Sequence, residues 1–222
     1  MKFYTEPIAK SPRIPKLVDA LFEKMPQIEA DRAVLLTESY KATEGEPIIT
    51  RRAKAFKHIL EHIPITIREN ELIVGSATRA PRSCQVFPEY SFEWLMAEFD
   101  TVHARLADPF FISDETKKTL SEVYKYWKGK TTSELATSYM SNEAKTAIDH
   151  GMFTPGNYFY NGIGHVTVNY PKVLSVGYRG IIKEAQAELK KVRHGDADCA
   201  RRRHFLEAVI MSCEAAITYA KR

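Results

Sequence analysis

Residues 151–170 read GMFTPGNYFYNGIGHVTVNY and interrupt a chain that elsewhere has the pattern of helices. Glycine and proline are interleaved there with aromatic side chains, which suits a packed loop that lines a space. Residues 156–165 combine hydrogen-bonding side chains, aromatic faces and flexible backbone, so they could hold a small polar ligand or simply fill gaps in the core. After the loop, alternation predicts a strand with His165, Thr167 and Asn169 on one face. This segment is the best candidate for function.

Apolar side chains recur at helical spacing on both sides of this loop. They predict helices that begin near residues 12, 29, 48, 88, 114 and 133 upstream, and near residues 171 and 196 downstream. Two β-rich runs, residues 65–67 and 72–74, predict a hairpin or two edge strands, and residues 75–87 are expected to be irregular. The last helix keeps its apolar stripe to within five residues of Arg222, which fits a chain cut inside a larger helical domain. The predicted fold is mainly α with short β elements.

The composition is that of a globular protein, with 222 residues, 44% hydrophobic and 27% charged. The net charge of +4 is spread along the chain, and the basic run 201–203 is expected on the solvated face of a helix. No basic and aromatic module accompanies it, so we expect no nucleic-acid partner. Apolar runs of four or five residues are too short for a membrane span, and the start has no signal-peptide pattern. Three cysteines without a CxxC pair indicate a cytoplasmic protein.

The motif HILEH at residues 58–62 matches the H-x-x-E-H pattern of inverted zinc metallopeptidases. Histidines four residues apart on a helix face the same way and could share Zn²⁺, with Glu61 as the base. The alternative is two surface histidines at a helix C-terminus, where a protonated imidazole complements the helix dipole. Pro64 ends this helix directly after the motif, and no downstream helix presents a clear third ligand. We therefore interpret the motif as structural and expect no metal site.

Motifs for nucleophilic catalysis and for phosphate binding are missing from the sequence. There is no G-x-S-x-G elbow, and none of Cys84, Cys199 and Cys213 adjoins a histidine. Cys213 lies on the apolar stripe of the last helix, where a buried packing thiol is expected in preference to a reactive one. The glycines at 162 and 164 precede a predicted strand instead of opening a helix, which is the wrong context for phosphate. We expect no bound cofactor in this chain.

Several stretches together resemble the glycyl radical enzymes related to pyruvate formate-lyase, and specifically the branch of coenzyme-B12-independent glycerol (diol) dehydratases. These stretches are EADRA (29–33), LTESYKATEGEP (36–47), HILEHIPITIR (58–68), ELIVGS (71–76), WKGKTTSELATSYM (127–140) and GNYFYNGIGHVTVNY (156–170). The resemblance runs from about Arg13 to the C-terminus and covers about the first quarter of such an enzyme. It implies that residues 1–222 are the N-terminal part of a pyruvate formate-lyase-like domain, truncated within a helix.

The resemblance implies a ten-stranded α/β barrel made of two half-barrels and wrapped by helices. In the family, a glycyl radical near the C-terminus takes hydrogen from a cysteine at the barrel centre, and the thiyl radical then takes hydrogen from the substrate. A glutamate acts as general base and water leaves. None of the three cysteines here has the family's Gly-Cys-Val-Glu-like setting. The resemblance therefore implies that this chain carries no catalytic residue and is inactive alone.

One functional residue is implied by the resemblance at a matching position. The histidine of the family's Gly-His-Val motif binds a hydroxyl of the diol, and that position is His165 here. Tyr158, Tyr160 and Asn161 are expected as further substrate-binding wall residues. The implied substrate is glycerol or 1,2-propanediol. A choline trimethylamine-lyase, a formate acetyltransferase-type enzyme and a non-catalytic helical interaction domain stay open as alternatives. The expected partners of the whole enzyme are a radical-SAM activase, which installs the glycyl radical, and a second copy in a homodimer.

Overall fold

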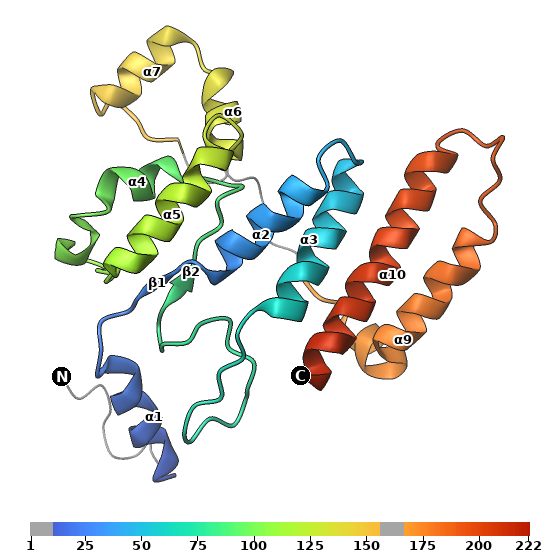
Figure 1. The fold of residues 1–222 in the computed structure, drawn as a ribbon, viewed down its shortest axis with the longest axis horizontal. Helices are drawn as coiled ribbons and strands as arrows, with labels where there is room; N and C mark the ends of the chain where they lie inside the picture. The colour runs from blue at the N-terminus through green and yellow to red at the C-terminus, as the bar shows by residue number, and fades with distance from the viewer. Residues whose placement is uncertain (1–10, 156–166) are drawn as a thin grey trace.

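The computed structural model describes residues 11–155 and 167–222, and it is mainly helical, as the sequence predicts (Figure 1). The elements in chain order are α1 (Arg13–Phe22), β1 (Ile28–Glu29), α2 (Asp31–Ala42), α3 (Ile48–His62), β2 (Cys84–Gln85), α4 (Glu93–Glu98), the 3₁₀ helix η1 (Val102–Ala104), α5 (Asp114–Trp127), α6 (Thr132–Ser138), α7 (Asn142–Asp149), α9 (Tyr170–Leu189) and α10 (Cys199–Lys221). No helix in these described ranges is long and apolar enough to cross a bilayer.

The hydrophobic core lies where α2 packs against both α3 and α5 (Figure 1). Its largest fully buried side chains include Phe92, directly before α4, Leu95 on α4 and Leu120 on α5. The buried indole of Trp127 donates from Nε1 to the hydroxyl of Thr37 on α2 at 2.8 Å. Burial of apolar side chains with their polar atoms paired is the main source of stability here.

A two-residue parallel sheet joins two distant segments beside this core. Ile28 pairs with Cys84 and Glu29 with Gln85. The sequence predicts a helix from Glu29, but the helix begins at Asp31 because Glu29 is in β1. Residues 75–87 are irregular as predicted, except for β2.

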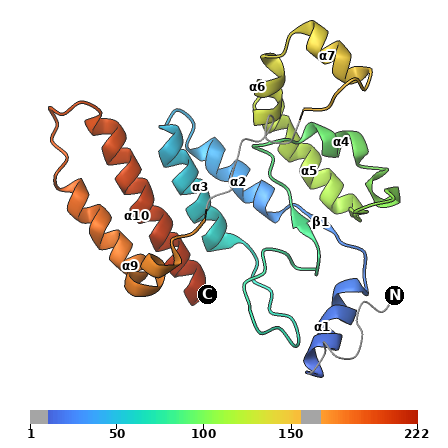
Figure 2. The same ribbon diagram turned by 180° about the vertical axis from the view of Figure 1, so that it is seen from behind.

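A second helical layer forms at the C-terminal end of the chain. The long helix α10 packs between α3 and α9, and Figures 1 and 2 show the three running side by side. A kink interrupts α9 at Gly177, which has φ 61° and ψ −179°. Glycine is suited to this position because side chains with a Cβ rarely adopt positive φ.

The two predicted strands at residues 65–67 and 72–74 are not formed. An isolated antiparallel bridge between Thr66 and Ser76 is present instead. Leu72, Ile73 and Val74 are exposed, and no partner strand for them lies among the described residues. A strand needs a neighbour to satisfy its backbone, so the β propensity of these residues alone does not produce one.

Two other expectations were wrong in position. The helix expected from Pro88 begins at Glu93, because the carbonyls of Glu89 and Tyr90 accept hydrogen bonds from the start of α6. In the strand expected from residue 165, the described residues 167–169 are irregular, because Asn169 instead caps α9.

Candidate functional site

The four residues predicted to bind substrate, His165, Tyr158, Tyr160 and Asn161, lie outside the described residues. Their assignment stays a prediction.

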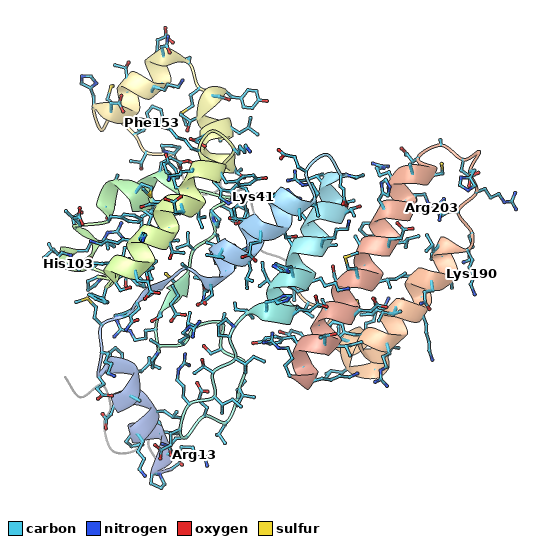
Figure 3. All side chains as sticks on the ribbon, viewed as in Figure 1. Arg13, Lys41, His103, Phe153, Lys190 and Arg203 are labelled. Atoms are coloured by element: carbon cyan, nitrogen blue, oxygen red, sulfur yellow. The ribbon has the colours of Figure 1, made fainter. Side chains whose placement is uncertain are left out.

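The flanks of that segment are described on both sides. On the approach, α7 ends and Gly151 turns the chain with φ 69°, and Phe153 is exposed (Figure 3). After the segment, Asn169 Oδ1 accepts a hydrogen bond from the backbone N–H of Lys172 at 3.1 Å. An asparagine N-cap satisfies a free donor of the helix and so fixes where α9 starts. Thr167 and Asn169, expected beside His165, are both exposed.

The two histidines of the HILEH motif have separate partners. His62 Nδ1 lies 2.8 Å from the carbonyl of His58, and His58 Nε2 lies 3.0 Å from Glu38 Oε2. The ring centroids are 4.4 Å apart. No group of three metal-ligating side chains that could hold an ion occurs within residues 11–155 and 167–222. The motif forms the C-terminal end of α3, where the His62 imidazole meets the backbone carbonyl of His58 one turn earlier.

Two of the three cysteines, Cys84 and Cys213, have the surroundings of packing residues. Burial, and secondarily the charge of Glu29, raises the pKa of the half-buried Cys84 thiol. Cys213 is buried in α10 as predicted, and burial followed by the charge of Glu214 raises its pKa. Raised pKa values keep both thiols protonated near neutral pH, whereas a nucleophilic cysteine needs a lowered one.

A buried carboxylate, which sequence reasoning missed, organises the loop before β2. Glu29 accepts hydrogen bonds from the backbone N–H groups of Arg79 at 2.9 and 3.0 Å and of Ala80 at 3.1 Å. Gln85 Nε2 donates to the same carboxylate at 3.2 Å. A buried charge is tolerated only when hydrogen bonds replace water, and here they do. The role of Glu29 is therefore to hold residues 79–85 against the start of α2.

A cavity of about 440 Å³ opens between α2, α3 and the segment after α5. Among its lining residues are three cations, Arg32, Arg52 and Lys130, and one carboxylate, Glu89, which pairs with Arg32 at 3.0 Å. Tyr40 also lines the cavity, and burial is the main cause that raises the pKa of its hydroxyl, so this hydroxyl is neutral. This set can attract an anion but offers no free base. Its charges come from separate segments, so no local motif in the sequence indicates it.

Comparison with known proteins finds a matching family and similar solved structures. The family model described as "Pyruvate formate lyase-like" matches residues 5–222. A solved structure on 1,2-propanediol dehydration in Roseburia inulinivorans is 59% identical, with a TM-score of 0.90, and the match covers 96% of this chain and 27% of that chain. The glycerol-bound B12-independent glycerol dehydratase of Clostridium butyricum is 56% identical, with a TM-score of 0.88, over 94% of this chain and 27% of that one.

A relative with lower sequence identity is also named as a dehydratase. The (2S)-3-sulfopropanediol dehydratase of Klebsiella oxytoca is 32% identical over 216 residues, which is 95% of this chain and 26% of that protein. The chain thus spans about a quarter of the length of the relatives it matches. The high TM-scores confirm that this mainly helical arrangement is the one found in the matching part of glycyl radical enzymes.

Proposed function

We propose, from the premise that this chain belongs to the pyruvate formate lyase-like family of glycyl radical enzymes, that it is the N-terminal region of a lyase that removes water from a small diol. One observation carries the proposal. The sequence identity to the two structures named for 1,2-propanediol dehydration and glycerol dehydratase is 56–59%, whereas it is 32% to the sulfopropanediol enzyme. An enzyme that acts on an unsubstituted small diol is expected to keep more of this sequence than one whose diol substrate also carries a sulfonate.

Within this proposal, His165 binds one hydroxyl of the diol. An imidazole has one nitrogen that donates and one that accepts, so it can make a single directed hydrogen bond to a hydroxyl group. Tyr158, Tyr160 and Asn161 line the same wall of the substrate chamber. Asn169 supports the arrangement from outside, since its cap on α9 fixes the point where the chain leaves this segment.

The radical chemistry is proposed to reside in the rest of the enzyme. Cys84 and Cys213 have raised pKa values and packed surroundings, which supports a structural role for both. The whole enzyme would then carry a glycyl radical installed by a radical-SAM activase, act as a homodimer and reside in the cytoplasm. This chain contributes binding and orientation of the substrate, and no proton transfer is assigned to it.

The test is made on the whole enzyme that contains this chain, activated without oxygen by its activase. Aldehyde formation from 1,2-propanediol, glycerol and choline is measured side by side. We expect turnover of one or both diols and none of choline. For His165→Ala we expect kcat/KM for the diol to fall by about 10- to 100-fold, the effect of one lost directed hydrogen bond that leaves a polar group unpaired.

A matched control is His103→Ala, because His103 is an exposed histidine in η1 at the periphery of the molecule (Figure 3). It is expected to leave kcat/KM unchanged. Turnover of choline in place of diols would refute the proposed substrate, and an unchanged kcat/KM in His165→Ala would refute the role of that histidine.

A further inference from the structure

The segment between α3 and β2 carries a cluster of exposed apolar side chains. We call residues 65–74 the apolar loop. Four of its side chains are largely exposed: Ile67 at 69%, Leu72 at 74%, Ile73 at 92% and Val74 at 56%. Single exposed apolar residues are ordinary on protein surfaces, but several of them together on one short loop mark an interaction site.

The apolar loop is held firmly at its base. The Arg68 guanidinium donates to the carbonyl of Thr78 at 2.6 Å and to the Ser76 hydroxyl at 3.1 Å, and it pairs with Glu71 at 2.8 Å. On the other side, the Tyr219 hydroxyl of α10 donates to the carbonyl of Gly75 at 3.4 Å. A loop that is already ordered loses little conformational entropy when a partner binds. The exposed side chains are therefore presented in advance to a partner.

The backbone of the apolar loop is also available. The N–H and C=O groups of Leu72, Ile73 and Val74 make no hydrogen bond to any other residue in the described ranges. These residues have high β propensity, which is why the sequence predicts a strand there. A β-prone segment with free backbone groups and apolar side chains can accept an added strand. The missing strand is thus explained by a missing neighbour.

Arg222, which directly follows α10, lies beside this loop (Figures 1 and 2). Arg222 donates to the carbonyl of Leu60 at 2.7 Å and to that of Ile63 at 3.0 Å, just before the apolar loop begins. Tyr219, three residues earlier, contacts Gly75 just after the loop ends. Polypeptide that continues from Arg222 would emerge next to the loop at a high effective concentration.

We propose that the apolar loop is the docking edge for the polypeptide that follows Arg222 in the whole enzyme, which adds a β-strand along residues 72–74 and covers Ile67 and Ile73. The occupant is an apolar, β-prone segment of the same chain. The inference rests on the proposed function in one respect, that this chain is part of a longer glycyl radical enzyme. Matched relatives are about four times as long, so such a segment is available.

The test is site-specific photo-crosslinking in the whole enzyme. The photo-reactive p-benzoylphenylalanine replaces Ile73 in one variant and Leu106 in a control, since Leu106 is fully exposed away from the loop. After illumination, peptide mapping by mass spectrometry identifies the partner. We expect the Ile73 position to crosslink within its own chain to residues soon after Arg222, and the Leu106 position to give no such product. A crosslink to a second copy, to a distant segment or to nothing would overturn the proposal.

A charge substitution gives a second, independent reading. Ile73→Lys should lower the unfolding temperature of the whole enzyme by about 3 °C or more, whereas Leu106→Lys should leave it unchanged. Equal behaviour of the two variants would contradict a covered loop. Diol turnover by the unmodified enzyme is scored separately. Crosslinking without diol turnover would support the docking edge and refute the proposed substrate. Diol turnover without crosslinking would support the substrate and refute the docking edge.

Discussion

The helix α5 and the helices α6 and α7 all begin with a side-chain cap but lie in different surroundings. Ser113, Thr131 and Ser141 each accept a hydrogen bond from the backbone of the first turn, at 3.0–3.2 Å. α5 then buries three side chains, including Leu120 and Trp127, whereas α6 and α7 bury none. A cap decides where a helix begins, and tertiary contacts decide what it packs against.

The difference divides the described part of the chain into a sealed region and an open one. Where α2, α3 and α5 meet, the apolar side chains of the core cover one another. Around α6 and α7 large side chains such as Leu135, Tyr139 and Met152 are exposed, immediately before the segment that we propose binds substrate. Helices with an uncovered apolar face are completed by a partner surface. In the longer enzyme that we propose, this open part is where the remaining polypeptide is expected to pack.

The largest effect is expected in the sealed region, from Trp127→Ala. The indole is 3% exposed, lies 5.2 Å from the Tyr40 ring between centroids, and holds the Thr37 hydroxyl. Its removal leaves a cavity and takes away the donor to the Thr37 hydroxyl oxygen, so the free energy of unfolding should fall by about 3–5 kcal/mol in urea titrations of the intact protein. Trp94→Ala is the matched control, because Trp94 is exposed. Equal losses of unfolding free energy in the two variants would contradict the division into a sealed and an open region.

This contrast also marks how much of the fold the sequence could predict. The apolar spacing of α5 and its start near residue 114 are local patterns, and both are confirmed. The pairing of β1 with β2 joins residues 56 positions apart over only two residues each, and no local pattern indicates it. The hydrogen bonds of Glu29 depend on the same pairing, so they could not be predicted either.

The candidate site is divided in a similar way. The structural roles expected for the HILEH motif and for Cys213 follow from helix position alone, and burial of Cys213 is confirmed. The lining of the cavity at Arg32, Arg52 and Lys130 requires three separate segments to meet, which sequence spacing cannot indicate. The substrate-binding role of His165 comes from a family resemblance and stays a prediction.

A smaller effect should distinguish the caps of the two helices in the open region, α6 and α7. Thr131 is 1% exposed, completes a capping box with Glu134 and also donates to Glu93 at 2.9 Å. Thr131→Ala therefore removes a cap and a buried hydrogen bond, and about 1–2 kcal/mol of unfolding free energy should be lost. Ser141→Ala removes an exposed cap, so its effect should stay near the lower end of that range. Hydrogen exchange should show faster amides across α6 and the core in the first variant, but only within α7 in the second. Identical exchange patterns in the two variants would count against a difference between the buried Thr131 cap and the exposed Ser141 cap.

The smallest effect concerns acid stability at the base of the apolar loop. The backbone N–H of Arg68, followed by its side chain, lowers the pKa of Glu71. A carboxyl whose pKa is lower in the folded state stabilises the fold above its ordinary value, and this contribution is lost as pH falls. Unfolding free energy measured between pH 6 and pH 4 should therefore lose less than about 1 kcal/mol from this pair, mostly below about pH 4.5. Glu71→Gln should be less stable at pH 6 and flatter toward pH 4. Glu44→Gln changes an exposed glutamate in the turn between α2 and α3 and should follow the unmodified protein. A flattened profile there would show that the Arg68–Glu71 pair is not the cause.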